Sequence, residues 1–144
     1  MHSINVQEII LRNAHLHNVR DRIGLRKGSW FSQISGRFDI IVSNPPYIAR
    51  GEIDHLATEV RVHDPRRALD GGPDGLDAYR HICRAAPVYL EAGGHLLLEI
   101  GFDQAQPVTA LMRTQGFENL SVDKDLEGRA RVVRGQIKKT KKGV

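Results

Sequence analysis

A short run of aromatic and β-branched residues, followed almost at once by two prolines, constrains the fold of this chain most. Phe38-Asp39-Ile40-Ile41-Val42 lies between Gly36 and the turn Asn44-Pro45-Pro46-Tyr47. An apolar run between turn residues is typical of a buried strand. Two successive prolines fix φ and donate no backbone hydrogen bond. The sequence therefore predicts a buried strand over 38–42 that ends in a rigid turn.

The rest of the chain alternates between patterns typical of helices and patterns typical of strands. Apolar residues at three- and four-residue spacing predict three helices, over residues 4–17, 76–86 and 104–115, the last closed by Gly116. Apolar or β-branched runs predict four further strands, over Arg22–Lys27, His95–Ile100, Phe117–Val122 and Ala130–Gly135, with Asp125–Gly128 as a hairpin turn between the last two. This alternation favours an α/β fold.

Smaller features of the pattern carry expectations of their own. Gly93-Gly94 predicts a turn, and the apolar run after it is typical of a strand buried on both faces of a sheet. Asp74, or the glycines before it, is expected to cap the helix over 76–86, and Pro87 to bend or restart that helix. A short helical turn is expected near Ile53–Val60.

The charged residues indicate a neutral body with a basic end. Four of the 21 Lys and Arg residues lie in the last eight positions, so the rest of the chain holds 17 bases against 17 acids. Nucleic-acid enzymes usually present a basic face, so nucleic acid is not expected as a partner. The lone Cys83 cannot form an internal disulfide, which favours a reducing cytoplasm. No apolar run approaches the ~20 residues that span a membrane, and the N-terminus lacks the pattern of a secretory signal.

The turn after the strand over 38–42 is the best candidate for a functional site. Ligands of open α/β sheets bind at the carboxyl ends of strands. The Asn44 side chain offers one acceptor and two donors, and the Pro45 carbonyl is forced to project. Together they could hold both hydrogens of a planar –NH₂ group, with Tyr47 as a flat stacking surface. Asn-Pro alone is a common turn dipeptide, but the full tetrapeptide at a strand end favours function over a plain turn.

These residues resemble a known family. Asn44–Tyr47 is similar to the signature of methyltransferases that modify amino groups of adenine, cytosine or glutamine. Longer segments resemble the HemK/PrmC family of release factor glutamine N5-methyltransferases, and the resemblance extends to about Gly135. The segments that carry it are Arg37–Ile48, Glu59-Val60-Arg61, Asp64-Pro65, Ala68–Leu76, Tyr79-Arg80, Gly93-Gly94, Leu98–Gly101 and Gln104.

The resemblance implies a Rossmann-like sheet, S-adenosylmethionine as the methyl donor, and the glutamine of a Gly-Gly-Gln loop in peptide chain release factors as the acceptor. Asn44 and the Pro45 carbonyl would hold the acceptor amide and serve as the catalytic groups. Pro46 and Tyr47 would pack beside the acceptor. Asn44 would also face the cofactor, whose adenine would border the loop that carries Ser29 and Trp30. The implied mechanism is direct in-line methyl transfer, which depends on positioning more than on a strong base.

Two parts of the family pattern are not found in this sequence. No Gly-x-Gly element occurs before residue 28, and Ser3 stands where the family has the acid that binds the cofactor ribose. We therefore expect residues 1–136 to be the C-terminal part of a catalytic domain, with a sheet incomplete at its N-terminus, and residues 137–144 to be a disordered basic tail. A truncated gene model, a decayed gene and a split enzyme completed by an N-terminal fragment all explain this pattern.

Two alternative functions stay open at this point. The same tetrapeptide grips adenine in nucleic-acid amino methyltransferases, and a non-catalytic remnant would also lack the cofactor loop. A metal site is not expected, because the paired short spacing typical of zinc ligands is absent from the loose group Asp54, His55, His63 and Asp64. The isolated chain is expected to bind S-adenosylmethionine weakly or not at all.

Overall fold

The computed structural model describes residues 6–56 and 65–138 and divides the chain into two compact units, Met1–Ile34 and Ser35–Val144. In the first unit, helix α1 (Val6–Leu16) confirms the helix expected over 4–17. The short 3₁₀ helix η1 (Arg20–Arg22) follows. The predicted strand over Arg22–Lys27 is wrong, since residues 23–27 take no regular structure. A strand needs an adjacent strand for its backbone hydrogen bonds, and the described part of this unit provides none.

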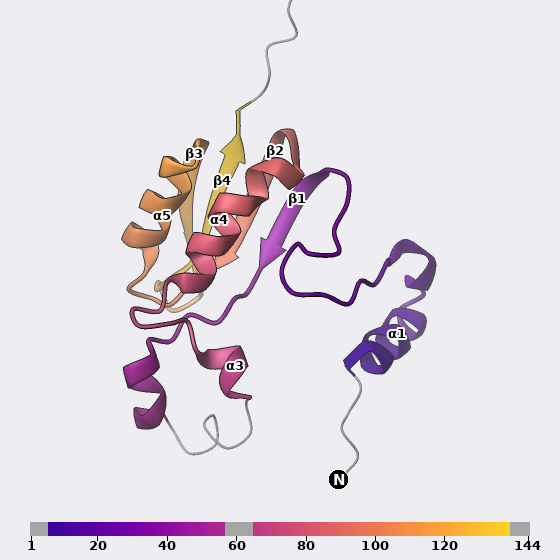
Figure 1. Cartoon of the computed structure of the whole chain (residues 1–144), viewed down its shortest axis with the longest axis horizontal. Helices are drawn as coiled ribbons and strands as arrows, with labels where there is room; N and C mark the ends of the chain where they lie inside the picture. Colours follow the sequence, from indigo (N-terminus) through magenta and orange to yellow (C-terminus); the bar gives the residue numbers. More distant parts are fainter. Residues whose placement is uncertain (1–5, 57–64, 139–144) are drawn as a thin grey trace, which may run out of the picture. The chain divides into compact units, whose positions relative to one another are not determined.

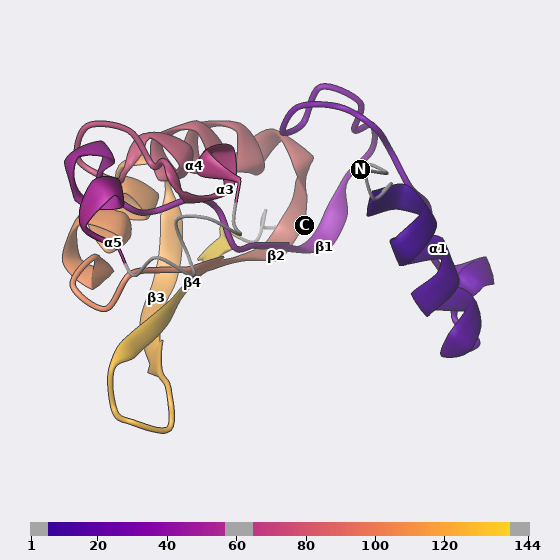
Figure 2. The same cartoon turned by 90° about the horizontal axis from the view of Figure 1, so that it is seen from below.

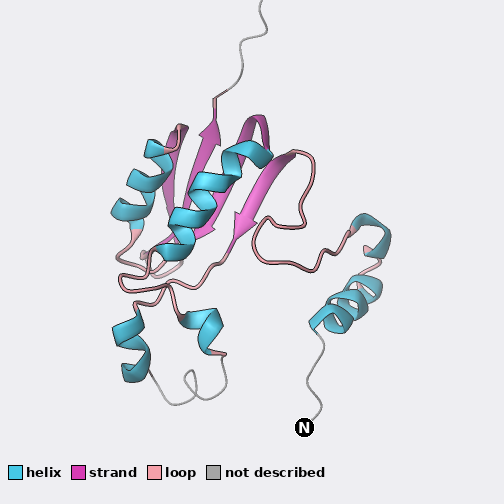
Figure 3. Ribbon diagram, in the orientation of Figure 1, coloured by secondary structure: helices cyan, strands magenta, loops and turns pink. Residues whose placement is uncertain are grey.

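The second unit contains a four-stranded mixed sheet (Figures 1 and 3). Its strands are β1 (Phe38–Ser43), β2 (Leu90–Glu99), β3 (Phe117–Lys124) and β4 (Ala130–Ile137), in the order β1-β2-β4-β3. β1 and β2 are parallel, while β4 runs antiparallel to both β2 and β3. The predicted α/β fold and the C-terminal hairpin are confirmed. β4 extends one residue into the predicted tail, which from Lys139 onward lies outside the described residues.

Two helices pack against one face of this sheet (Figure 2). They are α4 (Asp77–Tyr89) and α5 (Ala105–Thr114), and both confirm predicted helices. The core between helices and sheet is apolar, and its fully buried side chains include Tyr79, Ile82, Cys83, Leu96, Leu98, Val108, Met112 and Val133. Burial raises the pKa of the Cys83 thiol to about 12, so the thiol is a neutral core group.

The opposite face of the sheet is more exposed than the sequence suggests. Ile40 and Val42 of β1 are 58% and 72% exposed, although the pattern predicts a buried strand. In β2, Leu96 and Leu98 are buried, but His95 is exposed and Leu97 only half-buried. The prediction of burial on both faces is thus wrong. The reason is that α4 and α5 cover only one face of the sheet, the face on which Leu96 and Leu98 lie, so the side chains on the other face stay exposed.

The connections around α4 also differ in part from expectation. The predicted turn at Gly93-Gly94 is wrong, because both residues lie inside β2. They form an irregularity in the pairing with β1, where Phe38 pairs with Leu90 but Ile40 with His95. Gly93 takes a φ of +84°, which suits glycine. Helix α4 is not restarted at Pro87, since it continues to Tyr89.

The long connection from β1 to α4 holds two short helices, η2 (Arg50–His55) and α3 (Arg66–Leu69). η2 lies at the start of the helical turn expected near Ile53–Val60, of which residues 57–60 are outside the described part of the chain. Asp74 caps the start of α4 only indirectly. Its carboxylate accepts a hydrogen bond from the Leu76 N–H at 3.2 Å, and Leu76 itself is the residue at the N-cap.

Candidate functional site

The turn Asn44–Tyr47 leaves the sheet at the carboxyl end of β1, as predicted. Ser43 pairs with Leu98 of the parallel strand β2, so two parallel strands end side by side here. Asn44 is exposed, whereas Pro45 is buried. No hydrogen bond joins the Asn44 side chain to another described residue. The carboxamide of Asn44 can therefore bind a group from outside the chain.

The segment after the turn is bound to the glycine-rich loop that precedes α4. The Ile48 N–H donates to the Leu69 carbonyl at 3.1 Å, and the Gly71 N–H donates to the Ile48 carbonyl at 2.9 Å. A third bond runs from the Arg50 N–H to the Gly72 carbonyl at 2.8 Å. These bonds form a short parallel bridge. The turn is thus held by backbone hydrogen bonds on its C-terminal side.

Glycines make this close approach possible. A Cβ on Gly71 would lie 2.9 Å from the Pro46 carbonyl oxygen. A Cβ on Gly75 would lie 2.4 Å from the Tyr47 carbonyl oxygen, and Gly75 also has a φ of +74°. The sequence marks this loop only as a turn and helix cap. The structure adds that its glycines let two backbone segments touch.

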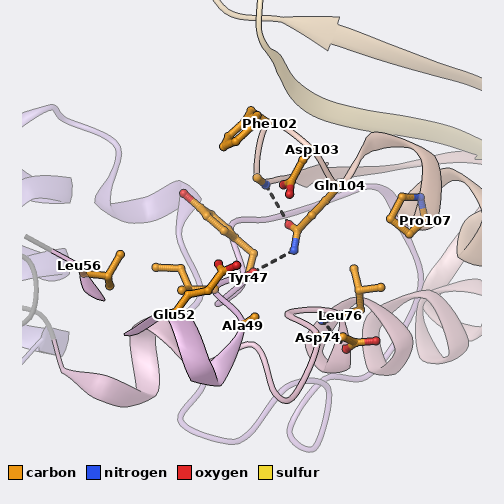
Figure 4. A pocket seen from close by; sticks show the side chains of 12 residues that line it. Tyr47, Ala49, Glu52, Leu56, Asp74, Leu76, Phe102, Asp103, Gln104 and Pro107 are labelled. Atoms are coloured by element: carbon orange, nitrogen blue, oxygen red, sulfur yellow. Dashed lines mark hydrogen bonds between the residues drawn. The ribbon is translucent and has the colours of Figure 1, made fainter. Parts of the chain in front are cut away.

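The side chain of Gln104, at the N-cap of α5, joins the same segments (Figure 4). Its Nε2 donates to the Tyr47 carbonyl at 2.9 Å and to the Gly75 carbonyl at 3.3 Å. Its Oε1 accepts from the Gly101 N–H at 3.0 Å. Gln104 therefore connects the turn after β1 with the end of β2. Sequence reasoning noted Gln104 only within the family resemblance and assigned it no role.

A cavity of about 470 Å³ opens beside Gln104 and the segments that it joins (Figure 4). Its lining combines aromatic and aliphatic groups with carboxylates, and includes Tyr47, Glu52, Leu56, Phe102, Asp103 and Pro107. Of the predicted site residues, Tyr47 lines this cavity, and Asn44, Pro45 and Pro46 do not. Phe102 and Asp103 were missed by sequence reasoning. Their position directly after a buried strand is the signal that could have indicated them.

Two carboxylates near the cavity are held in their charged form. Hydrogen bonds from the Arg80 guanidinium lower the pKa of Asp74 to about 2. The Gly72 N–H and the Arg50 guanidinium lower the pKa of Asp70. Both arginine contacts fasten the loop before α4, so these acids stabilise the loop and are poor candidates for proton transfer at neutral pH.

The two predicted cofactor residues Ser29 and Trp30 lie in the first unit. The Ser29 N–H donates to the Ser32 hydroxyl at 3.0 Å, and Trp30 has a φ of +52° in this turn. The structure describes the two units separately, so the expectation that Ser29 and Trp30 border the same cofactor as Asn44 stays a prediction. Among the described residues, no three His, Cys, Asp or Glu side chains are grouped as a metal would require.

The described helices include none that is both long and apolar enough to cross a membrane. The group Asp54, His55, His63 and Asp64 lies partly outside the described residues, because positions 57–64 are not described.

What the structure does bring together is the turn after β1, the glycine-rich loop, Gln104 and the cavity. All four lie at the carboxyl ends of two parallel strands.

Comparisons with known proteins bear on this arrangement. No protein-family model matches the chain. The release factor glutamine methyltransferase of Cereibacter sphaeroides is 46% identical over 129 residues, which are 90% of this chain and 46% of that protein. The release factor glutamine methyltransferase of Geobacter sulfurreducens is 47% identical over 127 residues, which are 88% of this chain and 44% of that protein.

A methyltransferase structure from Pyrococcus furiosus superposes with a TM-score of 0.60 at 20% identity, covering 92% of this chain and 57% of that one, and this likeness shows the fold. The resemblance that the sequence motifs indicate is confirmed by the curated relatives. Over about nine tenths of its residues, the chain is similar to release factor glutamine methyltransferases, of whose length it spans about half.

Proposed function

We propose that this chain supplies the acceptor-binding half of a protein methyltransferase that acts on the glutamine amide of a Gly-Gly-Gln loop in peptide chain release factors. The observation that carries the proposal is the carboxamide of Asn44, which forms no hydrogen bond with another described residue. It stands exposed at the carboxyl end of β1, in a turn that its neighbours hold rigidly. The names and the 46–47% identity of the relatives support the choice of substrate.

The chemistry requires that a weakly nucleophilic amide nitrogen be aimed at a methyl group. The Asn44 side-chain oxygen would accept one amide hydrogen, and the Pro45 carbonyl would accept the other. Tyr47, whose ring lines the cavity, would pack beside the acceptor, and Pro46 stiffens the turn between them. Holding both hydrogens fixes the orientation of the amide nitrogen. When the nitrogen gains the methyl group, one of its two hydrogens must leave as a proton, which solvent at the exposed turn would take up. Aligning reactants in this way can lower the activation free energy by ~7–11 kcal/mol.

S-adenosylmethionine, when bound, supplies the transferable methyl group. The chain's own residues fit only part of that cofactor. By resemblance, Ser29, Trp30 and Asn44 would border it, but the sequence has no glycine-rich turn before residue 28 to hold its methionine end. We therefore propose that a complementary N-terminal segment completes the cofactor site. The cytoplasmic setting follows from the proposed substrate.

The edge of the sheet supports this partner. β1 is the outermost strand, and its residues Ile40 and Val42 are exposed. An apolar edge strand is a template for pairing with another strand. The complementary segment would pair with β1 and cover these side chains.

The test is a methyl-transfer assay on the completed enzyme. The chain is joined to the part of the C. sphaeroides relative that it does not span, and labelled methyl transfer is measured with three acceptors. They are an intact release factor, a release factor with the loop glutamine changed to alanine, and DNA. The proposal expects labelling of the intact factor alone. Equal labelling of the Gln→Ala factor, or a preference for DNA, would assign the substrate to another class, and no labelling of any acceptor would favour a non-catalytic remnant.

A further inference from the structure

We infer that Gln104 is a positioning residue for the proposed reaction, because its side chain fixes the Asn44–Tyr47 turn relative to the end of β2. The inference rests on the proposed function for its catalytic consequence, but its structural part stands on contacts within the chain. Gln104 is half-buried and bridges three segments that lie far apart in the sequence.

The carboxamide of Gln104 uses its whole hydrogen-bonding capacity. Its two N–H donors serve the carbonyls of Tyr47 and Gly75, and its oxygen accepts from the Gly101 N–H. The Tyr79 hydroxyl lies 3.4 Å from the same oxygen and donates to the Glu99 carbonyl at 2.8 Å. A carboxylate has the same shape as a carboxamide but no donor. It would face two carbonyl oxygens, so the site selects an amide.

This anchor matters because Asn44 has none of its own. The Asn44 side chain makes no hydrogen bond within the described chain, so its place depends on the backbone that follows. Pro45 and Pro46 lie between Asn44 and Tyr47 and fix φ at two successive residues. A stiff link transmits the position of the Tyr47 carbonyl to Asn44 and to the Pro45 carbonyl. Gln104 thereby sets where the acceptor amide would be held.

The structural part is tested on the full chain by amide hydrogen exchange. The variants are Gln104→Met, which removes every hydrogen bond, and Gln104→Glu, which removes the donors. Gln106→Met and Gln106→Glu are matched controls, because Gln106 is exposed in the first turn of α5 and its side chain forms no hydrogen bond with another described residue. We expect exchange at the Ile48 and Arg50 amides to rise about tenfold in the Gln104 variants only.

A third amide, remote from the turn, distinguishes local loosening from global unfolding. The Asp125 N–H donates to the Arg129 carbonyl at 2.9 Å, in the hairpin between β3 and β4. Its exchange is expected to stay unchanged in all four variants. If Gln104→Met unfolds the chain, the inference is tested instead by hydrogen exchange of Gln104→Glu at low pH. Its protonated carboxyl group regains one donor, so protection of Ile48 should return as pH falls. Unchanged exchange at Ile48 and Arg50, or no pH response in Gln104→Glu, would overturn the inference.

The catalytic part uses the completed enzyme described above. Gln104→Met is expected to lower kcat about 100-fold, with KM for the release factor changed only a few-fold, because the Gln104 carboxamide is already bonded to the backbone of this chain and would act through the turn. Activity of Gln104→Glu should rise relative to Gln104→Met as pH falls. Wild-type rates in Gln104→Met would refute the positioning role. If the unsubstituted enzyme transfers no methyl group, the proposed function fails, whereas the exchange data still decide whether Gln104 fixes the turn.

Discussion

Asn44 is the residue on which the proposed chemistry depends most directly. Replacing it with alanine removes one of the two acceptors for the substrate amide, and misplacement near reacting atoms costs about 100-fold in rate. In the completed enzyme, Asn44→Ala should therefore lower kcat about 100-fold with little change in release factor binding. Asn13→Ala, at an exposed position of α1, is the control and should keep full activity. Equal rates in Asn44→Ala and the unsubstituted enzyme would contradict the assignment.

At Gly75, a side chain would destabilise the fold through both steric collision and backbone strain. Both Gly75 and Gly128 have positive φ, but only at Gly75 would a Cβ collide with backbone, 2.4 Å from the Tyr47 carbonyl oxygen. Gly128→Ala should lose ~1 kcal/mol from its strained backbone. Gly75→Ala should lose ~3 kcal/mol or more, because the collision displaces the turn. Urea unfolding of the two variants checks this, and equal losses would mean that the two segments do not touch.

Asp74 gives the stability of the chain a pH dependence. Its pKa is lowered to about 2 by Arg80, below the ordinary value of 3.8, so its contribution is present above about pH 4 and disappears as pH falls toward 2. Asp74→Asn should thus be less stable than the unsubstituted chain at pH 7, and this difference should shrink as pH falls below about 4 and through about 2. Urea midpoints measured across this range test the sign. A stability difference that grows toward low pH would be the opposite result.

At the scale of elements, β1 is the strand most open to pairing. Ile40 and Val42 are exposed on an edge strand, and edge strands of this kind promote association. Val42→Lys should reduce self-association of the isolated chain, measured by sedimentation velocity. Val88→Lys is the control, since Val88 is 65% exposed but lies on helix α4. If both variants associate equally, the edge is not the contact.

The elements also show how far the sequence predicts the structure. Helical periodicity predicts α1, α4 and α5, and the turn chemistry at Asp125–Gly128 predicts the final hairpin, because these signals are local. The strand over Arg22–Lys27 and the burial of β1 depend on neighbouring strands, which local patterns do not contain. The same holds for the site. The turn at Asn44 is visible in the sequence, while the contacts of Gln104 with Tyr47 and Gly75 arise only from the fold.

At the scale of the whole molecule, the chain spans about half of its curated relatives. Because no Gly-x-Gly element occurs before residue 28 and Ser3 stands where the family has its ribose-binding acid, the isolated chain should bind S-adenosylmethionine weakly or not at all. Losing several charge-assisted hydrogen bonds at ~1.5–3 kcal/mol each raises the dissociation constant of a micromolar site far above the micromolar range. Isothermal titration calorimetry checks this, with the completed enzyme as positive control. Micromolar binding by the isolated chain would show that its own residues form the site.

The turn at Asn44 is proposed to present a glutamine amide for methylation. The most direct measurement is tandem mass spectrometry of release factor after incubation with the completed enzyme and S-adenosylmethionine. We expect one added methyl group on the side-chain nitrogen of the Gly-Gly-Gln glutamine, and its near-complete loss with Asn44→Ala. A methyl group on any other residue, or the same yield on that glutamine with Asn44→Ala, would contradict it.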